Sequence, residues 1–226
     1  MHKMKQLLTL GLLLIMFSCG KEKVLQLPEI SHSEITEIYD VSPAYLFYDE
    51  TQKDSVELNR KNLISTTNWL VNVDKRLTLK QAIPHIKYLQ NKKQNSSHKK
   101  KSAKNYFTCN DTSRKNLGFI EFTDVVFESD FKNETLPDLK ADSYFGLVEF
   151  NSFEKIEMTV IYGEHMETLN LNFDDLLSYI RESKALTLKL SFNSNISFQD
   201  YISVKSKILS IDSVSLQLFN HELIFN

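Results

Sequence analysis

Apolar and polar residues alternate along several short segments of the chain, and this period of two is typical of β-strands with one buried face. The clearest examples are ALTLKLSF at 185–192 and VSLQLF at 214–219. Runs rich in β-branched and aromatic residues predict further strands at 45–48, 62–73, 116–127, 144–150 and 156–162. Strand-like segments therefore recur along the chain from residue 45 onward.

Helical spacing appears first within residues 77–89, where apolar side chains at positions 79, 82, 83, 86 and 89 share one helical face. Thr78, with Gln81 three residues later, forms a capping-box pattern that predicts the start of this helix. Pro84 removes one backbone hydrogen bond inside the helix, so we expect a kink there.

Two further helices are predicted in the second half of the chain. The first covers 171–181, with Asn172 as its N-cap and acidic residues in its first turn. The second begins at Ser197, which can cap the helix together with Asp200, and runs to about residue 210. The resulting order after residue 156 is β-α-β-α-β with short connections.

The helices at 77–89 and 171–181 align without gaps at an offset of 94, which pairs Leu77 with Leu171 and Ile83 with Leu177. The shared content is mainly the amphipathic pattern, and an internal duplication is one explanation for it. We therefore predict an α+β fold with two small β-α-β-type lobes, each a sheet with helices on one face.

The predicted organisation has four parts. Residues 1–18 are a removable signal peptide, and 19–54 form a tether with a first edge element. The first lobe covers 55–150 and contains a lysine-rich loop at 91–104, and the second lobe covers 151–226. The loop is either a solvated connection or a basic patch that touches anionic lipid or lipopolysaccharide phosphates.

The N-terminus has the three parts of an export signal. A short basic region with Lys3 and Lys5 precedes an apolar run at 6–17, which is too short to span a bilayer as a helix. The run ends in Ser18-Cys19, and this ending resembles the bacterial lipoprotein signal, although Phe17 is bulkier than usual. The resemblance implies removal of 1–18 and acylation of Cys19. An ordinary signal peptide or a short hydrophobic anchor is the alternative.

The chain has only two cysteines, Cys19 and Cys109. If Cys19 carries lipid through its sulfur, no intramolecular disulfide can form, and we expect Cys109 to be buried and unreactive. The alternative is a Cys19–Cys109 disulfide.

The element order from Ile156 to Phe225 resembles the periplasmic domain of the ExbD/TolR family, accessory proteins of proton-driven envelope motors. The resemblance covers the segments LTLKL at 186–190, ISFQDY at 196–201 and VSL at 214–216. The family's membrane helix with its acidic residue has no counterpart in the apolar run before Cys19. The resemblance therefore implies the fold and a role in envelope contacts, and it does not imply motor function.

Charge and motifs narrow the function further. The chain has 27 basic and 29 acidic residues, and loss of Lys3 and Lys5 with the signal makes the net charge −4, so nucleic-acid binding is not expected. The six histidines lack metal-binding spacing, and His165 is predicted to lie in a hairpin turn. Phosphate-binding loops and serine nucleophile motifs do not occur in the sequence.

These observations predict a lipid-anchored, non-catalytic cell-envelope protein without a cofactor or metal. We expect it to face the periplasm from the outer membrane or to lie on the cell surface, and to bind a partner protein. An envelope hydrolase or small-ligand-binding lipoprotein is the alternative, and it would require a pocket with converging polar groups.

Overall fold

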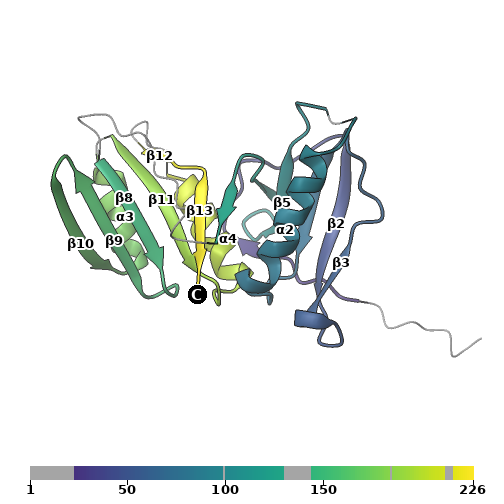
Figure 1. The fold of residues 1–226 in the computed structure, drawn as a ribbon, viewed down its shortest axis with the longest axis horizontal. Coiled ribbons are helices and arrows are strands. Elements are labelled where there is room, and N and C mark those ends of the chain that lie inside the picture. The colour runs from purple at the N-terminus through teal and green to yellow at the C-terminus, as the bar shows by residue number, and fades with distance from the viewer. Residues whose placement is uncertain (1–22, 99, 130–143, 184, 212–215) are drawn as a thin grey trace, which may run out of the picture.

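The computed structural model describes residues 23–98, 100–129, 144–183, 185–211 and 216–226. Within them the chain forms two mixed β-sheets and three α-helices, arranged as two lobes (Figure 1). This is the α+β architecture that the sequence predicts.

The first lobe is a six-stranded sheet with the strand order β1-β5-β4-β2-β3 and with β6 paired to β5. Its strands are β1 (Glu29–Ile30), β2 (Val41–Tyr48), β3 (Val56–Asn59), β4 (Asn68–Val73), β5 (Asn105–Asp111) and β6 (Asn116–Glu121). A short 3-10 helix, η1 (Lys53–Ser55), precedes β3, and helix α2 (Leu79–Gln94) connects β4 to β5. The central strands β2, β4 and β5 are parallel.

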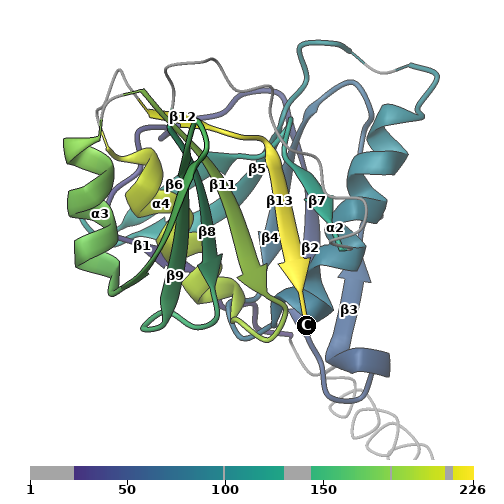
Figure 2. The ribbon, with the colours of Figure 1, turned by 60° about the vertical axis from the view of Figure 1, so that its left-hand side comes forward.

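The second lobe is a seven-stranded sheet with the order β10-β9-β8-β11-β13-β7 and with β12 paired to β11. Its strands are β7 (Val126–Glu128), β8 (Tyr144–Phe150), β9 (Ile156–Tyr162), β10 (His165–Leu171), β11 (Leu186–Asn193), β12 (Leu216–Leu218) and β13 (His221–Phe225). Helices α3 (Phe173–Glu182) and α4 (Phe198–Leu209) pack on one face of this sheet (Figure 2).

The two sheets share a topology that the sequence alignment missed. In both, an antiparallel pair (β2 with β3, β8 with β9) leads to parallel strands β4 and β5, or β11 and β13. The helix between the last two strands is α2 in the first lobe and α4 in the second. The pairing of α2 with α3 at an offset of 94 is therefore wrong, because α3 lies in the earlier connection between β10 and β11.

The starts of α2 and α4 lie side by side and exchange hydrogen bonds in a reciprocal pattern. Leu79 N–H donates to the Ile196 carbonyl over 2.9 Å, and its counterpart Phe198 N–H donates to the Leu77 carbonyl over 2.6 Å. Both helices begin with the predicted cap, Thr78 in α2 and Ser197 in α4, and these two residues form an isolated β-bridge. The two lobes are thus related by an approximate local two-fold at this point.

A continuous set of aromatic rings joins the lobes. The ring centre of Phe107, on β5 of the first sheet, lies 5.2 Å from that of Phe198 and 6.3 Å from that of Tyr201, and both of these residues are on α4. Tyr201 in turn lies 5.0 Å from Phe192 on β11, whose ring stacks on Phe150 at 4.9 Å. Helix α4 therefore fills the space between the two sheets, and both lobes belong to one hydrophobic core.

Two predicted boundaries are wrong. Strands β7 and β8 lie in the second sheet, so the lobes divide between β6 and β7, near residues 122–125, and not at 150. Residues 19–54 are also more than a tether, because β2 lies inside the first sheet between β4 and β3. Both errors arise because parallel pairing joins segments that are far apart in the sequence.

Candidate functional site at the junction of the two lobes

A groove of about 480 Å³ lies where α2 of the first lobe passes β13 and β7 of the second. Its volume falls within the range of typical ligand and peptide-anchor pockets. Leu79, Ile83, Pro84 and Tyr88 from α2, together with Ile224 from β13, provide apolar lining. The capping box at Thr78 fixes the start of α2 and so orients this face of the helix toward the groove.

Two lysine side chains without ion-pair partners among the described residues line this groove. Lys80 and Lys87 line it from positions about two turns apart on α2, and neither forms an ion pair with a carboxylate among the described residues. Glu128 of β7 lines the other side, but its carboxylate is engaged by other side chains. The groove therefore combines apolar lining with available positive charge.

Behind the groove, Glu128 joins two basic side chains of the second sheet. Its Oε2 accepts a hydrogen bond from Lys189 Nζ over 3.0 Å, and its Oε1 lies 2.8 Å from His221 Nδ1. Lys189 is fully buried, although its place in the alternating pattern of β11 predicted a solvent-facing position. Because a buried charge requires a partner, this ion pair links β7 to β11 across the intervening strand β13 and holds the edge strand in place.

A second buried network lies on the opposite face of β13. Glu222 accepts a hydrogen bond from the Tyr201 hydroxyl over 2.8 Å and forms an ion pair with Lys205, and both partners come from α4. Burial, reinforced by the Glu222 carboxylate, raises the pKa of Tyr201 well above 10.0, so its hydroxyl remains a proton donor. The network fixes α4 on β13 and does not open into the groove.

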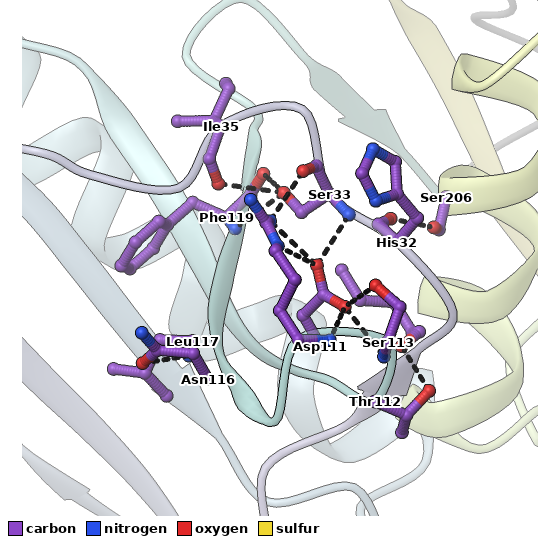
Figure 3. Close-up of polar contacts among 12 residues, drawn as sticks. His32, Ser33, Ile35, Asp111, Thr112, Ser113, Asn116, Leu117, Phe119 and Ser206 are labelled. Atoms are coloured by element: carbon purple, nitrogen blue, oxygen red, sulfur yellow. Dashed lines mark hydrogen bonds and ion pairs between the residues drawn. The ribbon is translucent and has the colours of Figure 1, made fainter.

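A smaller hollow of about 210 Å³ lies where α4 passes the first sheet, in the position that the local two-fold relates to the groove. It is lined by residues 32–35, the segment that follows β1, and Figure 3 shows the hydrogen bonds that fix this segment to the first sheet. The buried Asp111 carboxylate accepts hydrogen bonds from Ser33 N–H over 2.9 Å and from the Ser113 hydroxyl over 2.6 Å, and the Arg114 guanidinium forms an ion pair with it at 2.7 Å. These contacts join the loop after β1 to the end of β5, so Asp111 fixes that loop.

Protonation of Asp111 at acid pH is expected to lower the free energy of unfolding. Hydrogen bonds from the Ser113 hydroxyl and the Arg114 guanidinium hold the pKa of Asp111 well below its ordinary value of 3.8. A carboxyl with a lowered folded-state pKa contributes stability above the unfolded value and loses it as the pH falls through the folded value. The free energy of unfolding in urea should therefore fall as the pH drops below 3.8.

Asp111→Asn is expected to reduce this dependence on pH, while Asp124→Asn, at an exposed aspartate, should leave it unchanged. Urea titrations between about pH 5 and pH 2 measure how steeply the free energy of unfolding falls with pH in each variant. An Asp111→Asn variant with the wild-type slope would contradict the role given to this carboxyl.

Cys109 is fully buried on β5, as predicted, and burial raises the pKa of its thiol to about 12. The thiolate needed for nucleophilic reaction is therefore scarce at neutral pH. We expect no reaction of the native mature protein with a thiol reagent, and one thiol on unfolding. A Thr168→Cys variant, with a cysteine on the open edge strand β10, should react at once. Absence of any thiol after unfolding would support the disulfide alternative.

The predicted lysine-rich loop is shorter than expected. Helix α2 continues past Pro84 to Gln94, and Lys93 in its last turn is buried. The Lys93 ammonium donates to the Lys104 carbonyl over 2.7 Å and lies 5.1 Å from the ring centre of Trp69. Desolvation lowers the pKa of Lys93 to about 8, so this residue is structural and not part of a solvated patch.

The other residues singled out from the sequence occupy separate places. Cys19 lies outside the described residues. The predicted hairpin turn between β9 and β10 is present at Gly163–Glu164, but His165 is the first residue of β10 and does not lie in the turn. Gly163 has the positive φ of 57° that favours glycine in such turns. Among the described residues, three or more potential metal ligands do not cluster anywhere, and none of the helices has the length and apolar character needed to cross a bilayer.

Comparisons with known proteins identify no relative of this chain. No protein-family model, curated protein or solved structure matches it.

Proposed function

We propose that this chain is a lipid-anchored, non-catalytic protein of the bacterial cell envelope that binds a partner protein. The observation that carries the proposal is the apolar run at 6–17 followed by Ser18-Cys19. Acyl chains on Cys19 would supply membrane affinity, since each buried methylene contributes about 0.8 kcal/mol. The burial of Cys109 supports the proposal, because it leaves Cys19 without an accessible thiol partner.

The anchor is tested by intact mass and membrane partition. The wild-type mature protein should begin at Cys19 and carry the mass of its acyl chains. Cys19→Ala should lose this mass, whereas Cys109→Ala is the matched control and should keep it. Equal lipid mass and partition for the wild type and Cys19→Ala would end the proposal.

Partner binding is assigned to the groove between α2 and β13. Its apolar lining and the unpaired ammonium groups of Lys80 and Lys87 favour a partner segment that carries apolar side chains next to acidic ones. A photo-crosslinking residue in place of Lys87 should give a defined adduct in intact cells. The same residue in place of Lys155, which is exposed in the second lobe, should not.

Lys80→Glu provides the second measurement, because it places a like charge against the acidic partner at an exposed position that lines the groove. The adduct at position 87 should disappear in this variant while the protein remains folded. A small-molecule ligand is the second candidate, since the groove volume suits one. Adducts of equal yield from positions 87 and 155 would count against both candidates.

A further inference from the structure

We propose that the first lobe docks on anionic lipid headgroups of the same bilayer that holds the acyl chains of Cys19. The docking surface is a basic hollow formed by Arg60, Lys61 and Lys92. This inference rests on the proposed function, because it requires the lipid on Cys19.

The chain between the acylated residue and the fold is short. Lys23 is the first described residue, and its ammonium forms ion pairs with Asp49, at 2.8 Å, and with Glu57. Four residues of fully extended chain reach at most about 14 Å. The surface around Lys23 must therefore stay close to the bilayer.

The segment after Lys23 is bound to the first lobe within three residues. Gln26 N–H donates to the Asp74 carboxylate over 3.2 Å, and the Gln26 carbonyl accepts from Lys75 N–H over 2.7 Å. Strand β1 then pairs with β5 at Glu29 and Ile30. These contacts fix the chain to the first lobe from Gln26 onward, so the anchor point is a definite place on the molecule.

The basic hollow begins at this anchor point. Glu57, the ion-pair partner of Lys23, lines a hollow of about 540 Å³ together with Arg60, Lys61 and Lys92. The carboxylate of Glu57 is already engaged, and the three cations are exposed without ion-pair partners among the described residues. The Arg60 guanidinium lies 5.0 Å from the ring centre of Tyr88, which positions it at the hollow.

Lipid headgroups suit this surface better than a soluble acidic protein does. The anchor confines the hollow to the region next to the bilayer, and a cation near an anionic membrane surface strengthens association by about fivefold. Removal of all three cations should thus weaken the docked state by on the order of a hundredfold.

Energy transfer from the purified lipoprotein to acceptor-labelled lipid headgroups tests the proposal. A dye on Asn62→Cys, next to Lys61, marks the docking surface, and a dye on Met166→Cys marks the far edge strand β10. Labelling is specific because Cys109 is buried and Cys19 is acylated. Vesicles of phosphatidylcholine alone are compared with vesicles that contain phosphatidylglycerol.

We expect strong transfer at position 62 in anionic vesicles, weaker transfer in neutral vesicles, and weak transfer at position 166 in both. The triple variant Arg60→Gln, Lys61→Gln, Lys92→Gln should lose the anionic increment. The matched control Lys115→Gln, Lys155→Gln, Arg181→Gln removes the same charge from exposed positions elsewhere and should keep it.

The outcomes separate the two proposals. Protein that carries no acyl mass and leaves the vesicles would refute the anchor itself. Anchored protein with equal transfer at positions 62 and 166, or with an increment that survives in the triple variant, would overturn the docking surface alone.

Discussion

Replacement of Tyr201 by alanine is expected to lower the free energy of unfolding by about 4 kcal/mol and to destabilise both lobes together. Tyr201 is fully buried and contacts Phe107 of the first sheet as well as Phe192 of the second. The cavity left by the ring would remove packing from both sheets at once. Its hydroxyl is also a hydrogen-bond donor to Glu222, and that bond would be lost.

The measurement is a urea titration followed by two probes. Trp69, the single tryptophan, is buried on β4 and reports on the first lobe, while a dye on Met166→Cys reports on the second. Both transitions should shift together. Tyr201→Phe keeps the ring and should cost only about 1–2 kcal/mol, and Tyr39→Ala, at an exposed tyrosine, should cost less than about 0.5 kcal/mol. Separate transitions for the two probes would show that the lobes are independent.

Glu222→Leu is expected to cost about 3–5 kcal/mol, because it leaves the nearly buried ammonium of Lys205 without its carboxylate. It also removes the acceptor of the Tyr201 hydroxyl. The second substitution Lys205→Met should restore most of the loss, since an apolar pair of similar volume can replace a buried ion pair at little cost.

Chemical denaturation of the two single variants and the double variant measures the coupling between Glu222 and Lys205. Met and Leu keep the packing of α4 on β13, so the comparison isolates the charges. If Glu222→Leu alone were as stable as the wild type, the ion pair would have no structural role.

The sequence predicts those parts of the fold that depend on neighbouring residues. The capping pairs Thr78 with Gln81 and Ser197 with Asp200 mark the helix starts, because the side chains bond to backbone groups only three residues away. The alternation at 185–192 likewise identifies β11. Such signals are local, and the structure confirms them.

The sequence does not predict the parts that depend on distant pairing. Strand β7 joins β13 across more than ninety residues, and nothing within its three residues indicates that partner. The predicted strand at 62–73 is shorter, because residues before Asn68 form a loop in which the Thr67 hydroxyl and Trp69 Nε1–H both donate to the Ile64 carbonyl.

In the candidate site, too, the sequence predicts the local features and does not predict those that depend on distant residues. The helical pattern of α2 predicts a helix with one apolar face, but the groove forms only where that helix meets β13. Lys189 and Glu222 read as surface residues in alternating or mixed segments, and their burial depends on Glu128 and Lys205 from other elements. A single sequence carries no sign of such pairs.

The position of α4 also bears on how the chain reaches its native state. If the chain is exported unfolded, as the proposed function implies, residues 23–121 emerge first, and Phe107 on β5 then still lacks its contacts with α4. Phe122, which stacks on Phe107, follows soon after, but its partners on α4, Phe198 and Tyr201, would emerge roughly ninety positions later. The incomplete first half would then expose apolar side chains during that interval, and a prematurely terminated product would be prone to aggregate.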